Sequence, residues 1–314
     1  MKIKLFFLLI IPAQLALTQD IHFSQNFIDR IHLNPSLIGG EMRENNYRIS
    51  LQRKSQWQSV SIPFSTFSST FEMKNMYKNI NLGIEFYNDK SGTSSINLSQ
   101  LNIGLSTDFN LSNISKIGLG GVVGIAQKNI SYENLLFENQ ENLLINNLSY
   151  FDLGLGTYYK NNHQNLFWSL GYSIYHLNNP NISFNNDDSA DLPLKSNLFL
   201  RVNYPYNRKL LIRSELIVTK QSSQKEIIFG IKPDFELKNI VVSPMSYYRL
   251  NDAIILGFGI KKNNLEANLS YDINISDLSI ASNNRSGFEF SIIYLWKKKK
   301  KEIKLKEDIC PKYL

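Results

Sequence analysis

The chain has 314 residues, a formal net charge of +7, a charged fraction of 19% and an aromatic fraction of 12%. This length is sufficient to bury a core, and the single cysteine, Cys310, excludes a protein stabilised by internal disulfides. Few charges, many aromatic residues and abundant Asn and Ser together favour a β-rich protein with polar turns.

The start of the chain has the pattern of a secretory signal peptide. Two lysines precede an apolar run at 5–11, and small residues lead to a cleavage site near Thr18. A membrane-anchoring helix is the weaker alternative, because it needs roughly 20 apolar residues. No cysteine lies at the cleavage region, so lipid attachment is not expected. We therefore predict residues 1–18 as a signal peptide and an exported mature chain.

Residues 19–46 do not alternate and precede the first predicted strand. We predict an N-terminal segment that is either a periplasmic stretch or a plug folded into a barrel. The dipeptides Asn34-Pro35 and Gly39-Gly40 are typical of turns. They favour an ordered turn that supports the periplasmic end of the barrel, and a partner-binding role is the alternative.

Apolar and polar residues alternate through much of the region 47–297. In 265–275 every odd position is apolar and every even position is polar, and the last long segment, 286–296, ends in aromatic residues. A soluble sandwich also alternates, but segments near ten residues with aromatic ends favour strands that cross a membrane. After the signal peptide the chain contains no run of 18 apolar residues, so we predict no transmembrane helix.

We therefore predict an all-β fold, an antiparallel transmembrane β-barrel of the outer membrane with about 14 strands. The predicted strands are 47–57, 64–73, 80–88, 96–109, 115–126, 149–160, 165–176, 194–204, 209–220, 225–237, 239–249, 252–261, 264–275 and 286–297.

Segment lengths between the strands predict which end of the barrel faces which compartment. Short turns such as 262–264 are typical of the periplasmic side, while 127–148 and 177–193 are long enough for external loops. Trp57 and Phe64 are predicted as residues of the aromatic girdle at the membrane–water boundary, where they flank a turn that carries Pro63.

The inward positions of several strands predict a filled lumen. They carry aromatic residues, such as Tyr150, Phe167 and Tyr175. A cluster of four glycines also follows the alternation and suits a crowded lumen face better than a nucleotide site: Gly118, Gly120, Gly121 and Gly124.

The end of the chain is a basic tail, predicted over 298–314. Residues 297–314 hold eight lysines against three acidic residues, so the barrel region is close to neutral. An exported chain rarely meets nucleic acid, so we expect no nucleic-acid partner. Contact with anionic lipid headgroups and contact with an acidic periplasmic partner are both open interpretations of the tail.

Enzymatic chemistry finds little support in this sequence. The four histidines are His22, His32, His163 and His176, and His176 is expected in girdle or loop packing. No HExxH, GxSxG or phosphate-binding glycine pattern occurs, and Cys310 has no ligand-spaced partners. We predict a protein that is not an enzyme, with no catalytic residues, no cofactor and no metal site.

Two blocks of the sequence resemble a known family. The stretch 23–40, FSQNFIDRIHLNPSLIGG, is followed by 53–72, RKSQWQSVSIPFSTFSSTFE. Together these stretches resemble the type IX secretion system membrane proteins named PorP/SprF. The shared pattern is an FSQ block, an NP with glycine close behind, a QW, a PF and a Ser/Thr-rich strand. Weaker matches continue along the whole mature chain.

The resemblance implies an accessory of the type IX secretion system, used in gliding and secretion. It would assist export or surface anchoring of a large adhesin, with secretion machinery components, the adhesin's C-terminal domain and outer-membrane lipid as partners. The alternative is a solute channel. The possible partner-binding residues are Asn34, Pro35, Trp57, Pro63, Phe64, Lys298, Lys299 and Lys300.

Overall fold

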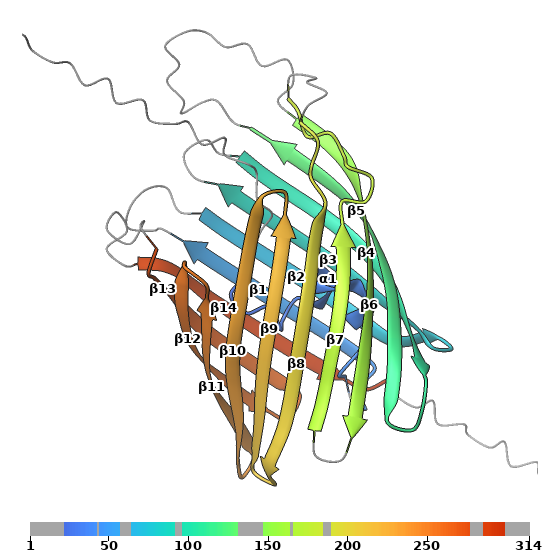
Figure 1. Ribbon diagram of the computed structural model, residues 1–314, viewed down its shortest axis with the longest axis vertical. Coiled ribbons are helices and arrows are strands. Elements are labelled where there is room, and N and C mark those ends of the chain that lie inside the picture. Colours follow the sequence, from blue (N-terminus) through green and yellow to red (C-terminus); the bar gives the residue numbers. More distant parts are fainter. Residues whose placement is uncertain are drawn as a thin grey trace, which may run out of the picture.

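The computed structural model is a closed barrel of 14 antiparallel strands (Figure 1). It describes residues 22–42, 44–56, 64–91, 96–130, 147–163, 166–184, 190–276 and 285–298. Each strand pairs with its neighbours in sequence, and β1 closes the barrel against β14. The predicted fold class and strand number are therefore confirmed. The strands are β1 (Tyr47–Gln56), β2 (Phe64–Tyr77), β3 (Ile80–Ser91), β4 (Ile96–Asn110), β5 (Ser115–Asn129), β6 (Asn147–His163), β7 (Leu166–Tyr175), β8 (Lys195–Asn207), β9 (Leu210–Gln221), β10 (Gln224–Leu237), β11 (Ile240–Arg249), β12 (Ala253–Lys262), β13 (Leu265–Asn274) and β14 (Arg285–Trp296).

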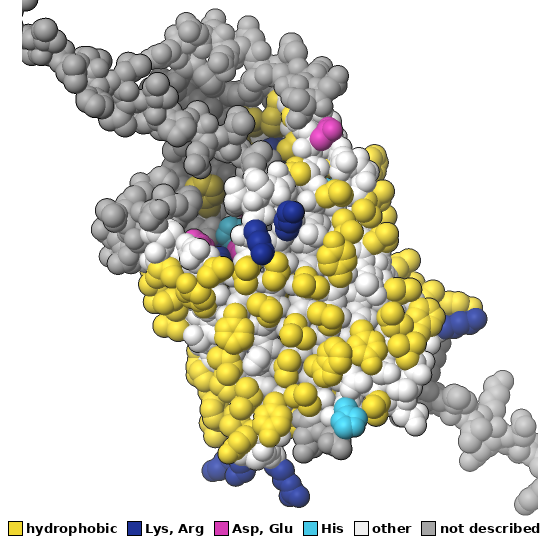
Figure 2. All heavy atoms as spheres, in the orientation of Figure 1, with side chains coloured by type: hydrophobic (Ala, Val, Ile, Leu, Met, Phe, Trp, Pro, Cys, Tyr) yellow, Lys and Arg dark blue, Asp and Glu magenta, His cyan; other side chains and the backbone are white. Residues whose placement is uncertain are grey.

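The alternation of the sequence sorts the side chains between lipid and lumen. On β13, Ser270 and Asp272 are buried inside the barrel, while Leu269 and Tyr271 stand exposed on its outer surface. The other strands repeat this division, and Figure 2 shows hydrophobic side chains covering the visible wall, with basic side chains at its margins. An apolar outer band around a polar interior is the arrangement that a bilayer requires.

Connection lengths separate the two ends of the barrel as expected. At one end, short turns join β2 to β3, β8 to β9, β10 to β11 and β12 to β13. At the other end lie the long connections, including 176–194 between β7 and β8, together with two short ones, from β9 to β10 and from β11 to β12. Short turns mark the periplasmic side. We call the two ends the turn side and the loop side. The first residue of β1 and the last residue of β14 both lie on the turn side.

Aromatic residues cluster at the turn side of the wall. The rings of Tyr47 and Trp296 stack at 5.3 Å, and those of Tyr159 and Trp168 lie 5.3 Å apart. Such rings hold a barrel at the lipid–water boundary. Of the predicted girdle pair, Phe64 begins β2 at the loop side and pairs with Gln56, whereas Trp57 lies outside the described residues, as does Pro63.

The N-terminal segment lies inside the barrel, where Figure 1 shows it as the blue chain behind the strands. It contains α1 (Arg30–Leu33) and a 3₁₀ turn, η1 (Pro35–Leu37). Asp29 accepts a hydrogen bond from the His32 N–H at the start of α1, the usual way to satisfy a free helical donor. Among the described residues, no helix is long and apolar enough to cross a membrane.

Candidate functional site

The plug, which we define as residues 22–42 and 44–46, fills much of the lumen. At the turn side, the Asn46 N–H donates to the Trp296 carbonyl, so the segment leaves the barrel end beside β14. At its other end, Lys54 Nζ donates to the His22 carbonyl near the loop-side end of β1. The plug therefore extends from one end of the barrel toward the other.

The Asn34-Pro35 turn is fixed to the barrel wall by one amide side chain. Asn34 Nδ2 donates at 3.1 Å to the carbonyls of Thr157 and Tyr172, which face each other across β6 and β7. Its Oδ1 accepts from the Ser36 N–H at 2.9 Å and so caps η1. Because this amide is fully buried and satisfied from both sides, the turn is part of the interior packing.

The wall makes room for this turn with glycines. A Cβ on Gly120 would lie 2.5 Å from backbone atoms of Pro35, and one on Gly156 would collide with Asn34. Gly83 and Gly104 leave similar space for the side chain of Ile38. The missing side chains let the plug backbone approach the wall closely. We call these four residues, on β3 to β6, the glycine groove: Gly83, Gly104, Gly120 and Gly156.

An arginine–glutamate cluster holds the middle of the plug. Glu72 on β2 lies 2.5 Å from Arg48 on β1 and 3.4 Å from Arg30 of the plug. Its second contact with the plug is the Gly39 N–H at 2.8 Å, and Arg48 donates to the Ile28 carbonyl at 2.6 Å. All of these charged side chains are nearly excluded from solvent. Breaking such a buried network by removing one partner is costly.

A second polar cluster binds the FSQ block. The backbone N–H groups of Ser24 and Gln25 donate to Glu289 on β14 at 2.7 and 2.9 Å. The Ser24 hydroxyl donates to Asp272 on β13 at 2.6 Å, and Lys54 on β1 lies 3.4 Å from the same carboxylate. The block thus acts as a connector between three strands at the closure of the barrel.

An apolar cluster lies on the opposite wall of the lumen, beside buried charged residues such as Arg201 and Glu215. Leu33 and Leu37 of the plug pack in a cluster with wall residues of β6 and β8 to β12. The Phe27 ring stacks on Tyr247 with a centroid distance of 6.5 Å, and Lys232 Nζ lies 4.1 Å from the centroid of the Phe27 ring. Burial of this surface gives the plug a hydrophobic anchor in addition to its polar ones. The wall members of this apolar cluster are Tyr158, Phe199, Ile217, Ile228, Met245, Tyr247 and Ile255.

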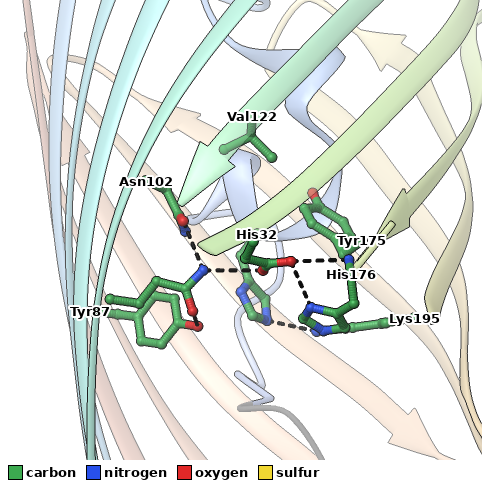
Figure 3. A pocket seen from close by; sticks show the side chains of 9 residues that line it. His32, Tyr87, Asn102, Val122, Tyr175, His176 and Lys195 are labelled. Atoms are coloured by element: carbon green, nitrogen blue, oxygen red, sulfur yellow. Dashed lines mark hydrogen bonds and ion pairs between the residues drawn. The ribbon is translucent and has the colours of Figure 1, made fainter. Parts of the chain in front are cut away.

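A small polar cavity remains between the plug and the wall (Figure 3). His176 Nδ1 lies 2.9 Å from Asp152, and Lys195 lies 3.1 Å from His32 Nε2 of the plug. His176, the first residue after β7, therefore faces the lumen beside Asp152. Of its two expected places, the girdle is wrong, whereas packing at the start of a loop agrees with this position. The cavity volume of about 20 Å³ has room for roughly one water molecule. The cavity is lined by His32, Tyr87, Gln100, Asn102, Val122, Asp152, Tyr175, His176 and Lys195.

This cavity is too small to be a substrate site. Within the part of the chain that the structure describes, no group of three or more His, Cys, Asp or Glu residues could hold a metal ion.

Docking of the plug should depend on pH through Glu41. The Glu41 side chain is exposed to solvent although protein surrounds it, and this partial desolvation raises the pKa of the carboxyl. Arg201, Arg30, Lys160 and Arg213 outweigh that effect and together lower the pKa from 4.5 to about 2. A carboxyl whose pKa is lowered on docking stabilises the docked state at pH values above the pKa of the free carboxyl. This stabilisation is lost as the pH falls from about 4.5 toward 2. We expect protease protection of the plug to decrease over this range. Glu41→Gln should flatten the decrease, and an unchanged profile in that variant would contradict the assignment.

The structure separates the predicted partner-binding residues. Asn34 and Pro35 are buried against the wall, Phe64 lies at the loop side, and Lys298 is exposed at the turn side, where its N–H donates to Asn46. No partner can reach the Asn34-Pro35 turn while the plug is docked. Trp57, Pro63, Lys299 and Lys300 lie outside the described residues, as do segments 1–18 and 299–314.

The charged lumen residues were absent from the sequence prediction. Arg48 and Lys54 alternate with the lipid-facing residues Ile49 and Leu51, so their inward direction was readable from the pattern. A charge on the inner face of a strand is the signal that could have identified them. Their partners lie on the plug and on distant strands, and no local pattern indicates those.

Comparison with solved structures shows that the barrel is similar in fold to two toluene transporters. The Pseudomonas putida toluene transporter TodX is 9% identical, with a TM-score of 0.57 over 89% of this chain and 95% of that one. The Ralstonia pickettii toluene transporter TbuX is 10% identical, with a TM-score of 0.55 over 86% and 93% of the two chains. At these identities the likeness concerns the fold alone.

Comparison by sequence gives a more specific result. No curated protein matches the chain. The family model of the type IX secretion system membrane protein PorP/SprF matches residues 16–294, which include every barrel strand apart from the last residues of β14 and also the whole plug. The chain is therefore an outer-membrane β-barrel that belongs to the PorP/SprF family of type IX secretion system membrane proteins.

Proposed function

We propose that this barrel is a non-enzymatic accessory of the type IX secretion system that assists the export or surface anchoring of a large adhesin. Membership of the PorP/SprF family over residues 16–294 is the observation that carries the proposal. The cargo would be recognised through its C-terminal domain, and other components of the secretion machinery would be further partners.

The filled lumen supports an accessory role over an open solute channel. The plug is held by the glycine groove, by Glu72 and by Glu289, and its apolar residues pack against the opposite wall. A steady flow of solutes would require these contacts to be broken. Cargo binding, in contrast, can use the loops and rims while the plug stays in place.

The turn-side rim supports a periplasmic contact for the basic end of the chain. Lys297 and Lys298 are exposed at the end of β14, on the side that the short turns assign to the periplasm. Lysines at the turn-side rim can bind anionic lipid headgroups or an acidic component of the secretion machinery.

The test is a comparison of surface and secreted proteins between wild-type cells, a clean deletion and the complemented strain. We expect the deletion to lose one or a few large adhesins from the surface while general type IX secretion continues. Complementation should restore them. An unchanged surface proteome would overturn the accessory role, and steady ion conductance of the purified protein in planar bilayers would then favour the solute channel.

A further inference from the structure

The barrel wall has one interrupted seam, between β10 and β11. Pairing runs from Ile228–Arg249 to Ile231–Ser246, stops, and resumes at Phe235–Val242 in the same register. An inserted residue would have shifted the register, so the interruption is not a β-bulge. Among the described strands, the other seams are either continuous or show a register shift.

Two prolines cause the interruption. In this register Pro233 and Pro244 stand directly opposite each other. Neither has an N–H, so the two hydrogen bonds that such a pair would exchange cannot form. The ladder therefore lacks backbone bonds between Ile231 and Phe235, a stretch of about 13 Å at the usual rise per residue. Proline is normally confined to edge strands, and a closed barrel has none.

The interruption faces lipid on its outer side, and on its inner side Met245 of the apolar cluster stands among the polar residues Lys232, Asp234 and Ser243. Ile231 and Phe235, which flank Pro233, are exposed among the hydrophobic side chains of the outer surface. Inside the barrel, Met245 is buried in the apolar cluster. A side-chain bond, from the Ser243 hydroxyl to Asp234 at 2.7 Å, crosses the seam at the lumen face.

We propose that the β10–β11 seam is a lateral portal through which an acyl chain of a membrane lipid reaches the apolar cluster of the lumen. Parting the strands between Ile231 and Phe235 breaks no backbone hydrogen bond, whereas parting any continuous seam does. Pro244 outside and Met245 inside are the apolar groups at the opening. The charged lumen residues beside Met245 form their ion pairs with other strands and not across the seam, Lys232 with Glu266 on β13 and Asp234 with Arg213 on β9. This portal is independent of the cargo-export role.

The test uses a cysteine inside the portal and a reagent that resides in the bilayer. Met245→Cys is placed in a Cys310→Ser background and reconstituted into vesicles that contain a phospholipid with a maleimide at the end of one acyl chain. The matched control is Ser270→Cys, which also faces the lumen and is paired on both sides, with Gly257 on β12 and Glu289 on β14. We expect labelling at position 245 and far slower labelling at position 270.

Restoring the ladder should close the portal. Pro233→Val with Pro244→Val returns both missing donors, and we expect labelling at Met245→Cys to fall by about thirtyfold, the effect of two backbone hydrogen bonds. Each single substitution returns one donor and should give an intermediate rate. Pro205→Val, on β8 where pairing with Leu211 is present, should leave the rate unchanged.

Folding of each variant is checked by its heat-dependent mobility in SDS gels, and the single substitutions serve if the double variant does not fold. Equal labelling at the two cysteines would overturn the portal. So would a rate at position 245 that ignores the proline substitutions, or labelling only by a water-soluble maleimide, which would show entry from the lumen mouth.

Discussion

Replacing Glu72 with Ala should release the plug and convert the closed barrel into a conducting one. Glu72 is the shared partner of Arg48 and Arg30 and also accepts from the Gly39 N–H, with its side chain fully buried. Its loss leaves two buried guanidinium groups close together without their carboxylate, and breaking such a network costs about 3–5 kcal/mol. Because the network joins plug to wall, this cost falls on the docked state.

The measurement is single-channel recording in planar bilayers, together with protease cleavage of residues 22–46. We expect a quiet, protected wild-type protein, and a variant that conducts and is cleaved. The control is Glu44→Ala, which removes an exposed pair with Lys297 at the rim. Solvent and salt screen an exposed pair so that it contributes little to stability, and this variant should therefore behave like the wild type. A folded Glu72→Ala barrel that stays silent and protected would show that the plug is held elsewhere.

Adding a single methyl group at Gly120 should displace the Asn34-Pro35 turn. The new Cβ would lie 2.5 Å from the carbonyl carbon and oxygen of Pro35 and from the Ser36 nitrogen. These are backbone atoms of a turn that two wall carbonyls fix, so they cannot rotate away. Overpacking of this kind costs about 1–3 kcal/mol. We expect Gly120→Ala to expose the plug to protease and to lower the unfolding temperature.

The neighbouring glycine provides the matched control. A Cβ on Gly121 would meet Leu155 at 3.3 Å, on the lipid side of the wall, where a side chain can adjust. Gly121→Ala should therefore keep the plug protected and leave the melting profile nearly unchanged. Equal sensitivity of the two variants would show that Gly120 acts through strand propensity and not through the plug.

This pair of glycines also corrects the sequence interpretation. All four clustered glycines were assigned to the lumen face, and Gly118 and Gly124 do contact the lumen residues Tyr158 and Asn102. Gly121 breaks the alternation and faces outward. Adjacent residues of a strand point to opposite faces, so Gly120 and Gly121 could not both face inward.

The sequence by itself determined the barrel. The period of two is a local property that each strand carries, and aromatic ends with short turns gave the strand number and the two sides. It also identified the Asn34-Pro35 turn and the FSQ block, because turn chemistry and family motifs are contiguous. Segment 19–46 could be described from the sequence only as a periplasmic stretch or a plug.

Only the tertiary structure decided what these residues contact. The Ser24 N–H meets Glu289 across 265 positions of sequence, and the glycine groove gathers residues from four strands around one turn. The opposition of Pro233 and Pro244 likewise exists only once β10 and β11 are paired in register. Alternation tells which face of the wall a side chain occupies, but closure of the barrel chooses its neighbours, since pairing between distant segments depends on the whole fold.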